Sequence, residues 1–138
     1  MAGTSLTVED YVGVLPAWAC RTLYSARVDP HLTAGCEVAP DVKESAIDSL
    51  VEVQHMFWRR VLGLQRRSMV VVLTTETGIQ PLMYRRVSLV LRFLLYLLDG
   101  GPTLPSLALA ASLRMARDKV PSWISDIWRL QETSITIA

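Results

Sequence analysis

The chain of 138 residues has few of the side chains on which metal binding and catalysis depend. It contains only two cysteines and two histidines: Cys20, His31, Cys36 and His55. Their spacing matches no familiar zinc pattern. A two-metal catalytic site needs several carboxylates that converge on ions about 4 Å apart. The only acids adjacent in the sequence are Glu9 and Asp10, in a polar N-terminal stretch. We therefore predict no metal and no cofactor.

The sequence also lacks the short motifs of common catalytic sites. It contains no Gly-x-Ser-x-Gly elbow, and neither cysteine has a context that would activate it. The run Gly100-Gly101-Pro102 is not followed by Gly-Lys-Ser/Thr, so it is a helix terminator and not a phosphate loop. We predict that the chain is not an enzyme, that it has no small-molecule substrate, and that both cysteines are buried thiols.

No hydrophobic run reaches the roughly twenty residues that a membrane-spanning helix needs. The best candidate, residues 87–98, is short and contains Arg92. The N-terminus has no charged-then-apolar signal pattern. We therefore expect an intracellular protein, nuclear or cytoplasmic, without membrane contact. Because 51% of the residues are hydrophobic, the surface is expected to be more apolar than usual, which points to a partner or a neighbouring domain.

The positive charge is concentrated in one segment, although the formal net charge is only +1. Residues 55–92 carry seven arginines and a single acid, Glu76, whereas residues 1–54 carry eight acids and three basic side chains. Such asymmetry points to polyanionic partners more than to a particular fold. Six of these arginines form adjacent pairs beside apolar runs: Arg59-Arg60, Arg66-Arg67 and Arg85-Arg86.

Apolar residues recur at helical spacing along most of the chain, and glycine and proline separate the helical segments. Helices are expected at residues 17–28, 29–35, 42–62, 69–77, 81–98, 104–119 and 121–131. The Val70–Val72 run is also compatible with a strand. The sequence predicts an all-α protein, an irregular bundle of five to seven helices. Its expected parts are a polar stretch (1–14), a main helical region (15–99), a C-terminal helical pair (100–132) and a frayed tail (133–138).

Local signals predict several helix ends and burial patterns. Asp41 and Glu44 have the spacing of a capping box that would open the long helix, and Gly63 stands where that helix would end. The helix at 81–98 is apolar nearly all round, which predicts deep burial. The four tryptophans could stack on bases, but we expect all of them in the core: Trp18, Trp58, Trp123 and Trp128.

Three blocks of sequence, in order, resemble the region after the palm in reverse transcriptases of non-LTR (LINE-type) retrotransposons. Residues 23–38 read LYSARVDPHLTAGCEV, similar to Leu-Tyr-x-Ala-x-Val-x-Pro-x-Leu-x-x-Gly-x-Glu-Val. Residues 50–64 read LVEVQHMFWRRVLGL, similar to Leu-x-x-Val-Gln-x-x-Phe-x-Arg-Arg-Leu-Leu-Gly-Leu. Residues 75–86 read TETGIQPLMYRR, similar to Glu-x-Gly-x-x-Pro-Leu-x-x-Arg-Arg. The resemblance covers roughly residues 15–98.

The resemblance implies a thumb and helical connector without the catalytic palm. The family's aromatic-x-Asp-Asp motif and its downstream zinc knuckle are both missing from this sequence, so polymerisation is not implied. The expectation is a non-catalytic fragment of such an enzyme, whose metal-binding carboxylates would lie upstream of Met1. In the parent enzymes the thumb helps to hold the template–primer duplex. Residual binding to the backbone of an RNA–DNA duplex would use four arginines: Arg59, Arg60, Arg66 and Arg67.

Other interpretations of the arginines remain open. They could be solvated charges at helix ends, or Arg59 and Arg60 could form ion pairs with an acid of the long helix: Glu44, Asp48 or Glu52. For Arg85-Arg86 we favour an internal role, with Glu76 as the nearest acid across the turn. A different class of function is a helical interaction module, in which the apolar helix 82–98 binds a protein partner or a second copy of the chain.

Overall fold

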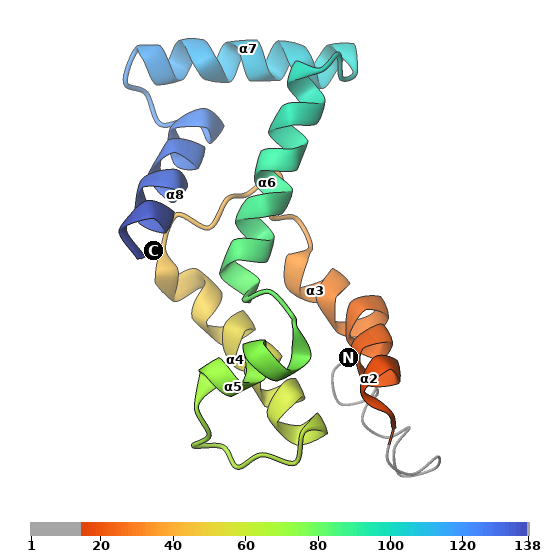
Figure 1. Cartoon of the computed structure of the whole chain (residues 1–138). Coiled ribbons are helices and arrows are strands. Elements are labelled where there is room, and N and C mark those ends of the chain that lie inside the picture. The colour runs from red at the N-terminus through yellow and green to blue at the C-terminus, as the bar shows by residue number, and fades with distance from the viewer. Residues whose placement is uncertain (1–14, 138) are drawn as a thin grey trace. The chain divides into compact units, whose positions relative to one another are not determined.

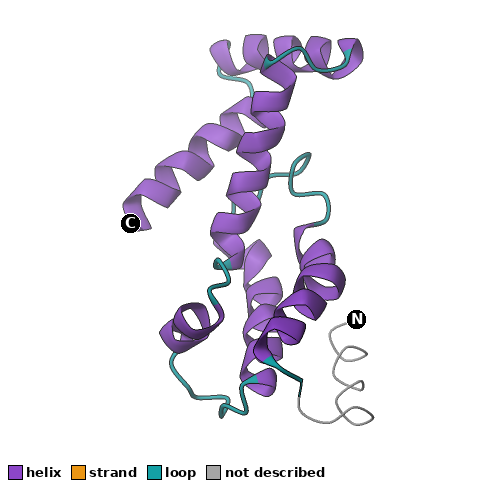
Figure 2. Ribbon diagram, turned by 45° about the vertical axis from the view of Figure 1, so that its right-hand side comes forward, coloured by secondary structure: helices purple, strands orange, loops and turns teal. Residues whose placement is uncertain are grey.

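The computed structural model describes residues 15–137, and for Glu44 and residues 134–137 the backbone alone. All regular structure in this range is helical, as Figure 2 shows. The elements are α2 (Ala17–Leu23), the π-helical turn η1 (Tyr24–Val28), α3 (Asp29–Thr33), α4 (Glu44–Val61), α5 (Val70–Thr77), α6 (Leu82–Leu98), α7 (Thr103–Arg117) and α8 (Trp123–Ile137) (Figure 1). Because α2, η1 and α3 run on without a break, they count as one helical run. The predicted all-α class with five to seven helices is confirmed.

The described residues form two compact units that interleave along the chain. The first unit contains residues 15–34 and 47–82, and the second contains residues 35–46 and 83–137. The predicted parts, 15–99 and 100–132, divide the chain elsewhere, and that division stays a prediction. The predicted polar stretch 1–14, with Glu9 and Asp10, lies outside the described residues.

The first unit is built around an aromatic cluster from two helical runs. Tyr24 of η1 packs against Phe57 and Trp58 of α4, with ring centroids 5.7 and 5.0 Å away, and the two α4 rings meet edge to face at 5.2 Å. These three side chains are 2–4% exposed. Burial of large aromatic rings supplies much apolar area, so this cluster is a main source of the unit's stability.

Buried residues of the first helical run recur at every fourth position. Cys20, Tyr24, Val28 and Leu32 are each 2–4% exposed. In a regular α-helix, four residues advance a side chain about 40° beyond one full turn, so such a row would drift around the helix. The wider π turn at 24–28 offsets part of this drift and keeps the row on one side. The helical run continues from Ala17 through Pro30 to Thr33, whereas two separate helices were predicted at 17–28 and 29–35.

The second unit has its own hydrophobic core. Five side chains from α6, α7 and α8 are 2–7% exposed and pack together: Val90, Leu97, Leu109, Ile124 and Ile127. The short connection after Leu98 turns the axis by 107°, so α7 leads away from α6 (Figure 1). The start of α8 is fixed by Ser122 and Ser125, since each backbone N–H donates to the other's hydroxyl at 2.8 and 3.4 Å.

Two of the predicted helix ends are confirmed. Gly63 has φ +65°, and the backbone N–H groups of Leu64 and Gly63 donate to the carbonyl oxygens of Arg59 and Arg60, which is the Schellman pattern. Gly78 ends α5 with φ +61°. Residues 70–72 lie in the first turn of α5, so the alternative of a strand there is wrong.

Other local expectations are wrong. α4 begins at Glu44, so Asp41 does not cap it, and α8 continues to Ile137 beyond the predicted end at Gln131. α6 is not buried all round, because Leu95 and Leu98 are 65% and 63% exposed.

The prediction of a core position fails for two of the tryptophans. Trp58 is buried and Trp123 packs against the core of the second unit. Trp18 and Trp128, in contrast, are 73% and 52% exposed.

Candidate nucleic-acid interface

The last turn of α4 and the loop behind it position the candidate arginines in the first unit. Arg59 and Arg60 occupy the final turn, where positive charge suits the carbonyl end of the helix. The Schellman turn at Gly63 then reverses the chain toward Arg66 and Arg67. Arg59 Nη2 donates a hydrogen bond to the carbonyl oxygen of Ser68 at 3.1 Å, which ties the end of α4 to the far side of this loop.

Three of the four arginines line one hollow of about 410 Å³. Its walls are formed by α4 and the following loop: Glu52, Met56, Arg59, Arg60, Leu64 and Arg66. Arg60 and Arg66 are exposed, whereas Arg59 is half-buried and its Nε atom is inaccessible and without a hydrogen-bond partner. Arg67 is also exposed but does not line the hollow. The structure thus brings together Arg59, Arg60 and Arg66, and leaves Arg67 apart.

Glu52 forms an ion pair with Arg66, whereas the ion pairs considered from the sequence were with Arg59 and Arg60. Arg66 Nη2 lies 3.4 Å from Glu52 Oε1, and both side chains are largely exposed. No ion pair links Arg59 or Arg60 to Asp48 or Glu52 in the described structure, and the side chain of Glu44 is outside it. An exposed pair of this kind contributes little to stability, about 0–1 kcal/mol, so an anionic ligand could compete for Arg66.

His55 lies one turn before these arginines on α4. Burial lowers its pKa, and the positive charge of Arg59 lowers it further. His55 is not among the residues that line the hollow, so the basic side chains in its lining are the three arginines.

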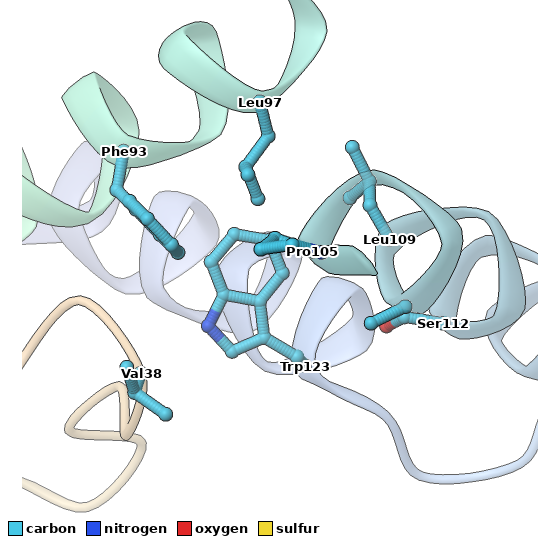
Figure 3. A pocket seen from close by; sticks show the side chains of 8 residues that line it. Val38, Phe93, Leu97, Pro105, Leu109, Ser112 and Trp123 are labelled. Carbon is cyan, nitrogen blue, oxygen red and sulfur yellow. The ribbon is translucent and has the colours of Figure 1, made fainter. Parts of the chain in front are cut away.

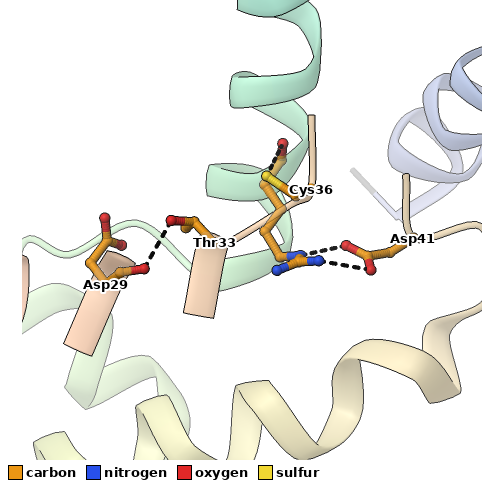
Figure 4. Close-up of polar contacts among 5 residues, drawn as sticks. Asp29, Thr33, Cys36 and Asp41 are labelled. Atoms are coloured by element: carbon orange, nitrogen blue, oxygen red, sulfur yellow. Dashed lines mark hydrogen bonds and ion pairs between the residues drawn. The ribbon is translucent and has the colours of Figure 1, made fainter. Parts of the chain in front are cut away.

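Within the second predicted pair, Arg86 has an internal role with a different partner from the one expected. Arg86 is 7% exposed, and its Nε and Nη2 atoms donate to the two carboxylate oxygens of Asp41, the second contact measuring 3.0 Å (Figure 4). The expected partner, Glu76, is exposed. The Cys36 thiol approaches the carbonyl oxygen of Arg86 at 3.9 Å in the same region. The pairing of Arg86 with Asp41 was missed because Asp41 was interpreted as a helix cap.

No metal centre is formed by the residues at 15–137, where no three His, Cys, Asp or Glu side chains come together. Cys20 and Cys36 are buried thiols that no disulfide joins, as expected. Burial raises the pKa of Cys36, and the nearby negative charge of Glu37 raises it further, so the nucleophilic thiolate is disfavoured. Three residues earlier in the chain, the Thr33 hydroxyl donates a hydrogen bond to the carbonyl oxygen of Asp29 at 2.9 Å, within α3 (Figure 4).

Within the described range, no single helix is long and apolar enough to cross a membrane. Together α6 and α7 meet the criteria of length and composition, but the break between them bends the axis by 107°.

Comparisons with known proteins identify no relative. No family model matches the chain, and no curated protein and no solved structure matches it either. The resemblance to reverse transcriptases therefore rests on the three sequence blocks alone.

Proposed function

We propose that this chain is a non-catalytic, thumb-like fragment derived from a non-LTR retrotransposon reverse transcriptase, and that it binds the phosphate backbone of an RNA–DNA duplex. The observation that carries the proposal is the hollow of the first unit, which three arginines line with a single acid, Glu52. The order of the three sequence blocks supports the ancestry. The proposal assigns no catalytic role to any residue.

The chemistry of the hollow suits a phosphate group. A guanidinium can donate two parallel hydrogen bonds to phosphate oxygens, and Arg60 and Arg66 expose theirs to solvent. Arg59 is less available, because its Nη2 atom is already bonded to Ser68. We expect Arg60 and Arg66 to make the contacts and Arg59 to supply background charge. Each contact releases condensed counterions, so the affinity should fall steeply with salt.

A binding experiment with charge-matched variants tests this proposal. Fluorescence anisotropy with a labelled RNA–DNA duplex is expected to show affinity at low salt. Replacing Arg60 and Arg66 together by Ala should weaken it about tenfold and reduce the slope of log K against log salt by about 2. Replacing Arg114 and Arg117 by Ala removes the same charge from exposed positions of α7 and should have a much smaller effect.

The outcomes separate binding in the hollow, binding through overall charge and no binding at all. If the two double variants lose equal affinity, binding depends on overall charge and the hollow is not the site. If the wild-type chain does not bind at low salt, the proposed function is wrong. Ancestry is tested separately: decayed palm sequence, including an aromatic-x-Asp-Asp motif, should be readable upstream of Met1 in the genome. Unrelated coding sequence there would argue against it.

A second candidate function is self-association through α6. Exposed apolar side chains recur on one face of this helix at Tyr84, Leu91, Leu95 and Leu98, with exposures of 37–65%. The intervals of seven, four and three residues are those of a coiled-coil seam. Arg86, Val90 and Leu97 form the buried face of the same helix. An apolar row of this kind favours burial against a matching helix, for which a second copy is the simplest source.

Sedimentation equilibrium across a concentration series tests the second candidate. The wild-type chain is expected to approach twice its monomer mass of 15.4 kDa as the concentration rises. Leu95→Glu should hold it at the monomer mass, because a carboxylate in an apolar helix–helix contact is strongly unfavourable. Val71→Glu, which places the same charge at a 65% exposed position of α5, serves as the control. A wild-type chain that stays monomeric at high concentration excludes this function.

A further inference from the structure

The second unit contains an apolar pocket of about 280 Å³ that none of the functions above uses. Side chains of α6, α7, α8 and the loop before α4 line it: Val38, Phe93, Leu97, Pro105, Ala108, Leu109, Ser112 and Trp123. Figure 3 shows these side chains gathered around the indole ring of Trp123. Since no charged residue is among them, the pocket suits an uncharged molecule.

The indole of Trp123 is held in place on two sides. Its Nε1–H donates to the carbonyl oxygen of Glu37 at 3.0 Å, and its ring meets Phe93 edge to face with centroids 6.0 Å apart. The nitrogen is therefore already satisfied, and what the ring offers the pocket is an apolar aromatic surface. A flat ring or short branched chain can pack on such a surface without any rearrangement of the pocket.

Ser112 is the one polar side chain in the lining. Its Oγ accepts a hydrogen bond from the backbone N–H of Ile124 at 3.2 Å. Within residues 15–137 its own hydroxyl proton is donated to no acceptor, and Figure 3 places Ser112 at the edge of the pocket. A hydroxyl carries one donor besides its acceptor capacity. The pocket can therefore supply a single hydrogen bond to a ligand oxygen.

We propose that this pocket binds one small uncharged molecule that has an aromatic ring or compact apolar body and one hydrogen-bond acceptor, such as a carbonyl oxygen. The apolar body would pack on Trp123 between Leu97 and Leu109, and the acceptor would face Ser112. The size agrees, because an apolar cavity of about 150 Å³ holds benzene, and this pocket leaves room for a ring with a carbonyl substituent. The inference is independent of the proposed arginine site, which belongs to the other unit.

A pair of probe molecules that differ only in the acceptor tests the inference. Acetophenone has the ring and the carbonyl oxygen, whereas isopropenylbenzene has nearly the same shape without the oxygen. In ¹H–¹⁵N spectra of the full chain, acetophenone is expected to cause a saturable shift of the Trp123 indole resonance, assigned with Trp123→Phe. Ser112→Ala should weaken acetophenone about fivefold and leave isopropenylbenzene unchanged, because only the ketone uses the hydroxyl.

Matched substitutions on α7 keep the test independent of folding. Ala108→Leu fills the pocket and should abolish binding of both probes, whereas Ala111→Leu makes the same change at an exposed position outside the lining and should not. The proposal is overturned if acetophenone gives no saturable shift, or if Ala111→Leu abolishes binding equally. It is also overturned if N-acetyl-phenylalanine amide binds and acetophenone does not, since the pocket would then receive a protein side chain.

Discussion

Replacing Asp41 by Ala is expected to lower the free energy of unfolding by about 3–5 kcal/mol, the largest effect we predict for one substitution. The side chain of Arg86 is 8% exposed, and the carboxylate of Asp41 accepts two of its hydrogen bonds. Without this carboxylate, the guanidinium loses two charge-assisted hydrogen bonds in a poorly solvated position. Urea denaturation, monitored by circular dichroism, measures the decrease in the free energy of unfolding.

Two further variants separate the charge effect from other causes. Asp48→Ala removes an exposed acid from α4 and should change the free energy of unfolding by less than about 0.5 kcal/mol. The double variant Asp41→Leu, Arg86→Met replaces the pair by apolar groups of similar size and should recover most of the loss. If Asp41→Ala and Asp48→Ala cost the same, the ion pair does not stabilise the fold as described.

Replacing Gln54 by Leu is expected to cost about 2–4 kcal/mol, because three hydrogen bonds are lost and two of them are buried. Gln54 is 4% exposed; its Nε2 donates to the hydroxyl of Tyr24 at 2.8 Å and to the carbonyl oxygen of Gln80 at 3.3 Å. Its Oε1 accepts from the backbone N–H of Leu82 at 3.1 Å, which satisfies a donor at the start of α6. Leucine fills the same space and offers none of these groups.

Hydrogen exchange gives this prediction a local readout as well as a global one. The Leu82 amide should exchange faster in Gln54→Leu by more than the global loss of stability explains, since its acceptor is gone. Gln65→Leu, at an exposed position of the loop after α4, is the control and should leave both measurements nearly unchanged. Unchanged exchange at Leu82 would show that the Gln54 side chain does not cap α6.

The features that the sequence predicted well are those that nearby residues decide. Gly63 and Gly78 end their helices because a positive φ is accessible to glycine at low cost, and no distant contact is needed to know this. The long helical patterns likewise predict the all-α class. The placement of Arg59 and Arg60 at the end of α4 followed from the same local signals.

The features that the sequence missed depend on distant partners. Asp41 has the spacing of a cap, but a cap contributes only about 1 kcal/mol, and loss of the carboxylate that bonds the buried Arg86 would cost more. Which face of α6 is covered depends on what packs against it, and apolar composition alone does not reveal that. The approach of Arg66 to Glu52 needs the loop geometry after Gly63, which no spacing rule supplies.

The π turn at Tyr24–Val28 has a consequence for how this segment tolerates changes in length. A π turn is equivalent to an α-helix that has gained one residue. Deleting an exposed residue of the turn, such as Ser25 or Ala26, would restore a regular helix and leave the segment before it facing nearly the same way. Cys20 would then lie seven positions before Val28, and seven residues of an α-helix come within about 20° of two full turns, so the buried row would be kept. A single-codon deletion here should therefore be tolerated better than one within the regular helix of α2.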